Sequence, residues 1–514
     1  MTNVISLSLL LNQRAALALC CCSTLVACIS REDQLAVTSS IRSATPNVWF
    51  TDISDYVHNF ADAPRLDVSA QRDTRLTDVR GQNESLQGEP SSRYVPFDAL
   101  EKSDVFQVAV AGEEVFVARE ECFGDSVFHT SQFFVDGPTE ITIISATPIT
   151  TYAIRPYHKE IAGTVEGNTL TFRVAQPEML MVTVNDYQPL CLFQTPPETD
   201  VPDRADSNVV YFPAGTHEVG VLRPKSGQTI YLEPGAWLKG RVYADGVNDV
   251  TIRGRGVIDA RGFTSKPEKI CGLEFKNSQG IRVEGIGLRT GEWWQSLFLL
   301  CQDVEVTHMN LMSFGLNNDG IDIDGVTNFR ASRNFIGCGD DGFGWHAVDA
   351  EANGQPPTRN CRAEDCVIYN AHAGNGLRVG ASMETELFED ITFRNITVLA
   401  HANAGIRSDH SDWALVKNLR FENFYIELPG RPIEIRVEKT RYSNSTGFRD
   451  ERGRIDGLHF ENVIAAGGKI ILEGFSEEHL IEDVHFVDSY NSDEKISGPK
   501  DIATNKFVKN VSFQ

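Results

Sequence analysis

The chain has 514 residues, of which 41% are hydrophobic and 23% charged, so it holds enough apolar material for a large core and too little charge for general disorder. At roughly 100–200 residues per domain, it has room for two to four domains. Lys and Arg total 47 against 71 Asp and Glu, and this net charge of −24 opposes binding to nucleic acid or to an anionic membrane surface. We therefore expect no nucleic-acid partner.

Residues 1–27 have the pattern of an export signal. Residues 5–27 are mostly apolar and end in Leu25-Val26-Ala27, directly before Cys28. A small residue before a cysteine resembles the lipobox of bacterial lipoproteins, which implies that the thiol of Cys28 carries a lipid. An ordinary secretory peptide or a single anchor helix is the alternative. We expect an outer membrane lipoprotein whose only membrane contact is the lipid, or otherwise a periplasmic or secreted protein.

A polar tether and a β-sandwich are expected next. Residues 28–46 are largely polar and unpatterned, as in a tether between an anchor and a folded body. Short alternating strands with turn signals follow over residues 47–201, as at 105–110, 139–145 and 169–174. Several short antiparallel strands of this kind predict a β-sandwich. No motif in this region indicates chemistry.

From residue 202 to residue 514 one phrase recurs, a polar turn followed by an alternating strand. Its copies are centred on Val250, Ile281, Val304, Phe329, Cys361, Ile391, Leu419, Leu458, Val484 and Val511. Strand repeats with a period mostly in the twenties and almost no helical pattern predict a solenoid. The Leu-x-x-Leu-x-Leu signature of leucine-rich repeats is missing. We therefore predict an all-β chain, a right-handed parallel β-helix preceded by a β-sandwich domain.

Three aspartates have the spacing of neighbouring coils. Asp319 precedes Asp340 and Asp341 by 21 and 22 residues, about one short coil. Residues one coil apart in a solenoid stack at roughly the 4.8 Å strand spacing, so the three carboxylates should meet on one outward face. Crowding raises the pKa of at least one carboxyl and separates a protonated acid from ionised partners, which is what glycosidic hydrolysis requires. These aspartates are the expected catalytic residues.

Other residues of the same coils should extend this face into a groove. The expected substrate-binding residues are Asn317, Trp293, Trp294, Trp345, His346, Asn375, Arg407 and Asp409. Asp322 and Asp324 alternate with isoleucines and are expected at solvated exterior positions, and structural roles are expected for His372 and His410. Most of the internal cysteines, Cys301, Cys338, Cys361 and Cys366, are expected to pack as small interior residues.

In chain order, these motifs resemble those of glycoside hydrolase family 28, the polygalacturonases and their relatives. The motifs are Asn317-x-Asp319, Asp340-Asp341, Gly374-x-Gly376-Leu377-x-x-Gly380 and Gly405-Ile406-Arg407. The resemblance covers residues 208–514, and a β-sandwich ahead of the helix is similar to family 49, the dextranases and isopullulanases. The resemblance implies an inverting hydrolase, and we expect neither a cofactor nor a metal at its site, while a structural calcium stays open. In it Asp340 is the general acid, and Asp319 and Asp341 hold and deprotonate the attacking water.

The chain departs from polygalacturonases at two positions. Asn375 stands where they have histidine, and Arg407-Ser408-Asp409 stands where they have Arg-Ile-Lys. Because that lysine pairs with the uronate carboxylate, an ionised Asp409 would repel a galacturonate. We therefore expect a monomeric, endo-acting hydrolase of a neutral or differently substituted polysaccharide. A pectin hydrolase, a polysaccharide lyase or epimerase on the same fold, and a non-catalytic glycan-binding surface protein are the alternatives.

Overall fold

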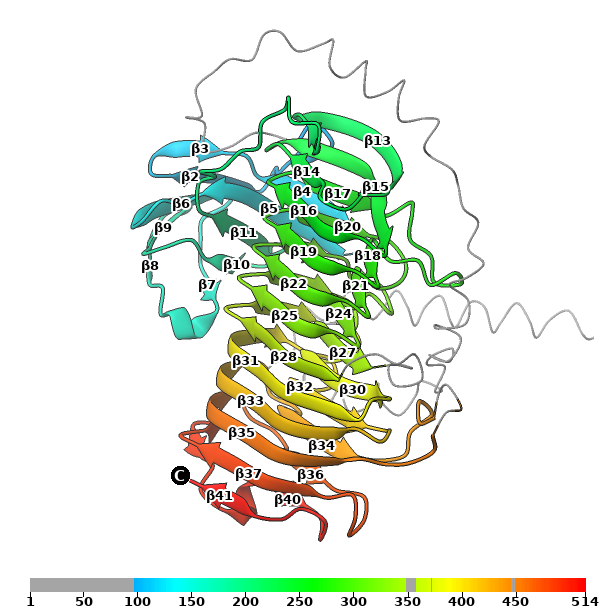
Figure 1. The fold of residues 1–514 in the computed structure, drawn as a ribbon. Helices are drawn as coiled ribbons and strands as arrows, with labels where there is room; N and C mark the ends of the chain where they lie inside the picture. Colours follow the sequence, from blue (N-terminus) through cyan, green and yellow to red (C-terminus); the bar gives the residue numbers. More distant parts are fainter. Residues whose placement is uncertain (1–96, 125, 348–356, 371, 445–446, 448) are drawn as a thin grey trace, which may run out of the picture. The chain divides into compact units, whose positions relative to one another are not determined.

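A computed structural model describes residues 97–514, apart from 125, 348–356, 371, 445–446 and 448 (Figure 1). The expected signal segment, the lipid-bearing Cys28, the tether and the first part of the expected sandwich domain lie outside the described residues. Within the described part, no helix is long and apolar enough to cross a membrane. The helices found there are two short 3-10 turns, η1 (Tyr157–Lys159) and η2 (Pro499–Asp501).

Two packed sheets come first, as the alternating pattern predicts. One sheet has the order β1 (Glu101–Lys102), β4 (Ala118–Cys122), β5 (Ser126–Phe134), β11 (Leu190–Thr195), β10 (Met179–Val184), β7 (Tyr152–Arg155). The other has the order β3 (Glu113–Val115), β2 (Phe106–Val110), β6 (Thr139–Ser145), β9 (Thr169–Val174), β8 (Gly163–Glu166). In β2, Phe106, Val108 and Val110 point into a core shared with the facing sheet, while the residues between them point outward. The predicted sandwich is confirmed.

From Val209 onward, the chain winds into parallel coils whose strands stack in three columns (Figure 1). The first column is β12 (Val209–Phe212), β14 (Thr229–Leu232), β16 (Asn248–Gly254), β19 (Gln279–Glu284), β22 (Gln302–Thr307), β25 (Thr327–Ser332), β28 (Thr358–Glu364), β31 (Leu387–Ala400), β33 (Leu415–Ile426), β35 (Arg454–Ala465), β37 (Ile481–Val487) and β41 (Val511–Phe513). The second is β13 (Gly215–Leu222), β15 (Ala236–Asp245), β17 (Val257–Ala260), β20 (Gly287–Thr290), β23 (Asn310–Met312), β26 (Phe335–Cys338) and β29 (Val367–Asn370), continued by β31, β33, β35 and β38 (Tyr490–Asn491) with its antiparallel partner β39 (Glu494–Lys495).

The third column carries the predicted site. It starts at the end of β15 and continues through β18 (Leu273–Lys276), β21 (Ser296–Leu299), β24 (Ile321–Asp324), β27 (Phe343–Ala347), β30 (Leu377–Met383), β32 (Ile406–His410), β34 (Ile433–Val437), β36 (Ile471–Glu473) and β40 (Ala503–Thr504). Each strand of a column pairs in parallel with the equivalent strand of the next coil, as in β24 on β27. The predicted parallel β-helix is confirmed.

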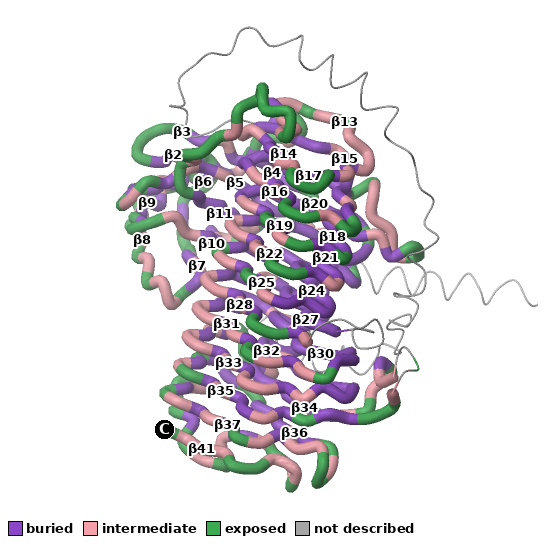
Figure 2. Tube along the Cα trace, viewed as in Figure 1, coloured by how far each residue is buried: buried purple, intermediate pink, exposed green. Residues whose placement is uncertain are grey.

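The repeat centres set the register of the first column. Val250 pairs with Ile281, Ile281 with Val304, and Val304 with Phe329. The same register continues at Ile391, Leu419, Leu458, Val484 and Val511. All of these side chains are inside, except Val511 at the last coil, and Figure 2 shows buried and exposed positions alternating along the coils. One apolar core therefore fills the helix from Phe212 to Ile502.

The cysteines behave as interior residues. Cys301, Cys338, Cys361 and Cys366 are buried and unbridged, as expected. Cys122, Cys191 and Cys271 are also buried and free. Burial raises the pKa of the Cys301, Cys361 and Cys366 thiols to about 12, which makes them unreactive packing groups.

The six-stranded sheet of the sandwich packs on the second column of the helix. Phe128, Met179, Met181 and Phe193 of the sheet form one apolar cluster with helix residues that include Met312, Phe314, Phe335, Val367 and Leu399. A buried and a half-buried ion pair also join the sheet to the helix. The Arg289 guanidinium pairs with the Glu120 carboxylate, and Arg155 Nε donates to Glu427 Oε2 at 2.7 Å. The division predicted at residues 201 and 202 falls between Thr195, where β11 ends, and Val209, where β12 begins.

Candidate active site

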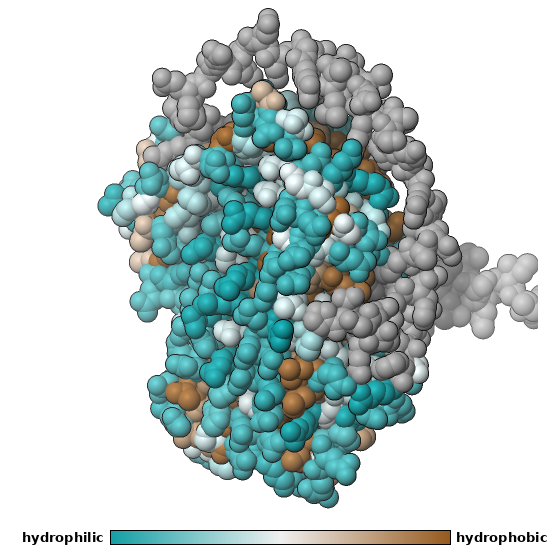
Figure 3. Space-filling view, viewed as in Figure 1, coloured by the Kyte–Doolittle hydropathy of each residue, from teal (hydrophilic) through white to brown (hydrophobic). Residues whose placement is uncertain are grey.

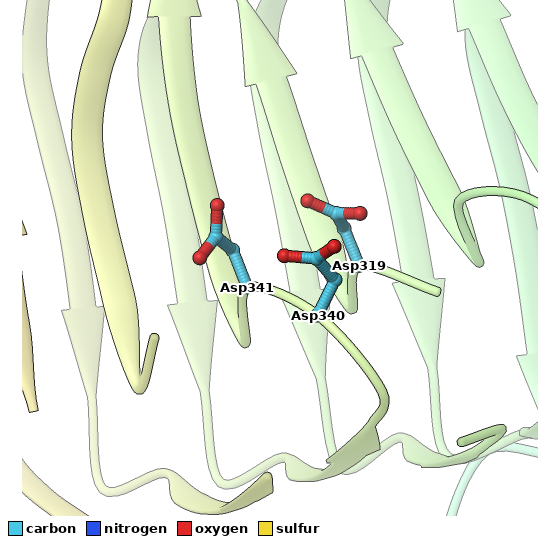
Figure 4. A group of neighbouring side chains, drawn as sticks. All are labelled: Asp319, Asp340 and Asp341. Atoms are coloured by element: carbon cyan, nitrogen blue, oxygen red, sulfur yellow. The ribbon is translucent and has the colours of Figure 1, made fainter. Parts of the chain in front are cut away.

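Asp319, Asp340 and Asp341 meet where the second column passes into the third. Asp319 lies in the loop between β23 and β24, and Asp340 and Asp341 lie in the equivalent loop between β26 and β27 (Figure 4). Each offers a carboxylate oxygen, and the three oxygens lie within 4.8 Å of one another. The one-coil spacing in the sequence therefore brings the three carboxylates together as expected.

Main-chain hydrogen bonds and glycines clamp these two loops against each other. Gly320 N donates to Asp341 O at 2.8 Å, and Gly339 N donates to Asn318 O at 3.0 Å. A Cβ on Gly320 would lie 2.4 Å from Gly342 O, so a side chain there would force the coils apart. The close approach of the aspartates depends on glycines beside them.

Burial dominates the ionisation of the triad. It raises the pKa of Asp340 to about 7, with a further contribution from the neighbouring Asp341 carboxylate. Burial, and then the charges of Asp340 and Asp322, raise the pKa of Asp319 well above its usual range. Burial also raises the pKa of Asp341, but there the Arg378 guanidinium and hydrogen bonds from Asn375 oppose it. Asp341 is therefore the member of the triad best supported as an anion.

Asn375 and Arg378 supply that support. Asn375 donates to Asp341 Oδ1 twice, from its main-chain N at 2.8 Å and from Nδ2 at 2.6 Å. Arg378 NH1 lies 3.4 Å from Asp341 Oδ2, and its Nε and NH2 donate to the two carboxylate oxygens of Asp409 at 2.9 and 2.6 Å. Arg378 was not among the predicted site residues. Its position directly after inward-facing Leu377, inside the Gly374–Gly380 motif, is the signal that could have found it.

Asp409 is ionised but paired. Arg378 donates to both of its carboxylate oxygens. Burial disfavours the charge of Asp409, but the Arg378 guanidinium outweighs burial, so the pKa of Asp409 falls below its usual value. The negative charge expected from the sequence is therefore present with a guanidinium beside it, and the contact of Asp409 with a substrate stays a prediction.

Asp322 and Asp324 are not solvated exterior residues, contrary to expectation. Both are fully buried, and Asp322 sits close enough to Asp341 and Asp340 that burial and these two charges raise its pKa well above the usual range. A Cβ on Gly344, in the next coil, would lie 2.0 Å from Asp322 Oδ1, so glycine makes the room that this carboxylate occupies. Alternation in the sequence shows that these side chains leave the core, but it cannot show what covers them.

The aromatic residues divide into two groups. Trp293 stacks on Trp294 with ring centroids 5.4 Å apart, and Trp294 stacks on His346 at 5.8 Å, beside the triad. Both tryptophans are 6% exposed, so they are mostly covered, and their contact with sugar stays a prediction. Trp345 is wrong as a substrate-binding residue. It is fully buried inside the helix, with its ring 4.4 Å from that of Phe393.

Arg407 lies one coil beyond Arg378 in register and pairs away from the triad. Its NH1 lies 2.7 Å from Glu434 Oε2, and its NH2 lies 3.3 Å from Glu438 Oε1. The roles of Arg407, Asn317 and His346 in binding stay predictions. His410 is buried with Nε2 2.7 Å from Ala414 O, whereas His372 is exposed.

Several polar atoms around the triad have no hydrogen-bond partner among the described residues. They are Asp319 Oδ1, both carboxylate oxygens of Asp322, Asn375 Oδ1, Trp293 Nε1 and His346 Nδ1. Buried polar atoms are normally satisfied by protein or by ordered water, so this cluster is a place where water or ligand hydroxyls would be bound. The three triad carboxylates also form a donor set that a hard divalent cation accepts.

Comparison with known proteins concerns the sequence and the fold. No family model matches the chain. A polygalacturonase of Cryptomeria japonica is 25% identical over 130 residues, which cover 22% of this chain and 25% of that protein. Among solved structures, Dex49A from Penicillium minioluteum matches with a TM-score of 0.53 at 11% identity, over 83% of this chain and 97% of that one. A family 28 exopolygalacturonase of Yersinia enterocolitica matches with a TM-score of 0.38 at 15% identity, over 72% of this chain and 96% of that one.

The resemblance expected from the motifs is confirmed. The sequence match is to a polygalacturonase, and the fold is shared with Dex49A over 83% of this chain. The sequence match spans about a quarter of the curated relative's length, so activity and substrate are argued from the site itself.

Proposed function

We propose that this protein is a glycoside hydrolase that cleaves a polysaccharide at the Asp319, Asp340 and Asp341 site. The observation that carries the proposal is the juxtaposition of three buried carboxylates whose environments differ, one with a pKa of about 7 and one supported as an anion. A protonated acid beside an ionised base is the pair that glycosidic cleavage requires.

The local electrostatics favour one division of roles. Asp340 holds a proton up to about neutral pH and donates it to the glycosidic oxygen as the bond from that oxygen to the anomeric carbon breaks. Asp341, supported by Arg378 and Asn375, takes a proton from the water that attacks the anomeric carbon. Asp319 has a pKa well above its usual range, which favours a second protonated group that orients the water rather than a second base.

Inversion is part of the proposal through the resemblance to family 28. The carboxylate oxygens lie within 4.8 Å of one another, whereas acid and base are about 6.5–9.5 Å apart in most inverting enzymes and about 5–5.5 Å apart in retaining ones. The anomeric configuration of the first product, read by proton NMR, therefore decides between inversion and retention.

The charges beside the triad favour a neutral glycan. The arginines of β30, β32 and β34 are paired with carboxylates: Arg378 with Asp409, Arg407 with Glu434, and Arg436 with Glu434 and Glu473. A uronate would have to displace one of these carboxylates to gain a cation. The net charge of −24 also disfavours a polyanionic substrate at low salt.

Export, attachment of a lipid at Cys28, endo action and a monomeric state belong to the same proposal. They rest on the apolar segment before Cys28 and on the family resemblance. Incorporation of labelled fatty acid into the full chain, lost in Cys28→Ala, would support the anchor.

The test is a screen of the full chain against neutral α-glucans, pectins and algal galactans. New reducing ends without ultraviolet-absorbing unsaturated products are expected on a neutral glycan, with EDTA leaving the rate unchanged.

Asp340→Asn should lower kcat about 10²–10⁴-fold while retaining glycan affinity by calorimetry, because a general acid contributes rate rather than binding. The matched control is Asp488→Asn, an exposed aspartate in the described coils far along the chain from the triad. Unsaturated products would instead indicate a lyase, and no product on any glycan would leave a binding protein.

A further inference from the structure

We infer that the hairpin of β4 and β5 in the sandwich positions the two loops that carry the catalytic aspartates. The inference rests on the proposed function, and it assigns a role in catalysis to a domain whose sequence carries no chemical motif. It makes Phe128 a positioning residue, which acts through the loop it touches rather than on the substrate.

The hairpin holds the loop between β23 and β24 by main chain and by packing. Phe314 N donates to Phe123 O at 2.8 Å. The ring of Phe128 stacks on the ring of Phe314, with centroids 4.7 Å apart and planes 22° apart. A Cβ on Gly124 would lie 2.5 Å from the main-chain carbon of Phe314, so the two segments are in direct contact.

From Phe314 the contact passes directly to the aspartates. A Cβ on Gly339, the residue before Asp340, would lie 2.0 Å from Gly315 O. Asn318 N donates to Gly315 O at 3.2 Å, and Asn318 O accepts from Gly339 N at 3.0 Å and from Asp340 N at 3.3 Å. A shift of Phe314 therefore moves the chain on both sides of the triad.

The helix holds this loop as well. Residues 313–320 lie outside the strands, but Ser313 N donates to Gly337 O at 3.2 Å, and Asn318 Nδ2 donates to the main-chain oxygens of Gly291 and Trp293. The hairpin adds the Phe128 ring and the Phe123 main chain at Phe314, while Leu316 at the tip of the loop is 45% exposed. Catalytic groups misplaced by about 1 Å can lose about 10²-fold in rate, so the placement of this loop matters for turnover.

The experiment compares variants in the full chain by kcat, KM, pH profile and hydrogen exchange. Phe128→Ala removes the ring beneath Phe314, and Gly124→Ala forces the hairpin and the loop apart without removing apolar volume. Both should lower kcat about 10–100-fold with KM within about twofold, and should shift the basic limb of the pH profile. Phe128→Leu should restore most of kcat, because it refills the contact.

The matched control is Phe193→Ala. Phe193 belongs to the same apolar cluster, but its ring meets Phe335 of strand β26, with centroids 5.2 Å apart, and not the loop. Because its ring contact is with a strand fixed by ladder pairing, Phe193→Ala should lower stability and change the pH profile far less than Phe128→Ala. The inference is overturned if Phe128→Ala and Gly124→Ala keep the wild-type kcat and pH profile, or if Phe193→Ala changes the profile equally.

Hydrogen exchange separates this inference from the proposed function. Amides of residues 313–320 and 338–342 should exchange about tenfold faster in Phe128→Ala than in the wild type or in Phe193→Ala, because these loops open locally. If the wild type cleaves no glycan but exchange changes in this way, the proposed function fails and the mechanical coupling stands. Unchanged exchange in an active enzyme refutes the coupling alone.

Discussion

At the scale of single residues, burial opposes the charges that catalysis uses. Asp340, Asp319 and Asp322 are all buried close to like charges, and each has a raised pKa. Burial and like charges disfavour the ionised forms, so the folded protein is more stable when these carboxyl groups are protonated. The site therefore couples the protonation state that cleavage needs to the stability of the fold.

This coupling predicts how activity and stability depend on pH. The pKa of Asp340 is about 7 in the folded protein, above the roughly 3.9 of an unfolded aspartate, so the folded state binds this proton more tightly. Its contribution to stability is complete below about pH 4 and is lost as pH rises through about 7. We expect the melting temperature to fall between pH 5 and pH 8, and kcat/KM to fall above about pH 7 as the acid loses its proton.

Asp340→Asn tests the stability half of this prediction. A neutral amide does not titrate, so the variant should be more stable than the wild type at pH 8. The gain in the free energy of unfolding should be on the order of a few kcal/mol at pH 8 and smaller at pH 5. Calorimetry at the two pH values measures it, with Asp488→Asn as the reference. Equal gains at both pH values would contradict the assignment of the raised pKa to Asp340.

At the scale of elements, each coil depends mainly on its neighbours. Phe460 is fully buried and stacks on Phe421 with centroids 5.2 Å apart and on Phe486 with centroids 4.7 Å apart, which joins three successive coils. In a solenoid, stability is approximately a sum of coil and nearest-neighbour terms. A cavity in one coil should therefore loosen the coils nearest to it first.

Phe460→Ala tests this locality. The substitution should cost about 3–5 kcal/mol in the free energy of unfolding of the coils that contain it. Hydrogen exchange should rise in the coils of β33, β35 and β37, while the protection of the coils of β24 and β27, and glycan cleavage, are retained. Phe475→Ala, at a side chain 45% exposed, is the control and should change neither. Equal loss of protection in the triad coils would refute the locality.

At the scale of the whole molecule, the sandwich and the helix are joined through buried polar contacts as well as apolar packing. The side chains of Arg289 and Glu120 are 4% and 1% exposed, and Thr130 Oγ1 also donates to Glu120 at 2.9 Å. The viewed surface is largely hydrophilic (Figure 3), in keeping with the charge of the chain. The ion pair of Arg289 with Glu120 and the hydrogen bond from Thr130 are therefore buried between the sandwich and the helix.

Glu120→Gln should weaken this junction strongly. Removing one partner of a buried ion pair costs about 3–5 kcal/mol, because the remaining charge loses its compensation. We expect a lower melting temperature and faster proteolysis at the junction. The control, Glu114→Gln, breaks the exposed pair with Lys102 and should cost less than about 1 kcal/mol. Equal losses of stability in the two variants would contradict the larger contribution of the buried pair to the free energy of unfolding.

The coil register and the meeting of the triad follow from the spacing of residues along the chain. The repeat centres from Val250 to Val511 recur locally, and each coil closes within about one repeat, so offset along the chain becomes distance in space. Asp319 and Asp341 lie two residues before Ile321 and Phe343, which pair directly, and the distance between the aspartates follows from that spacing.

The directions and the partners of the neighbouring side chains depend on the three-dimensional packing. Trp345 pairs with Ile323 and so points inward, because a shift of one residue along a strand exchanges core for surface. Arg378 and Asp409 lie on neighbouring coils, as their spacing of 31 residues allows, but the spacing does not show that their side chains pair with each other. The contact of Phe128 with Phe314 joins residues 186 positions apart, and it depends on how the sandwich packs on the helix.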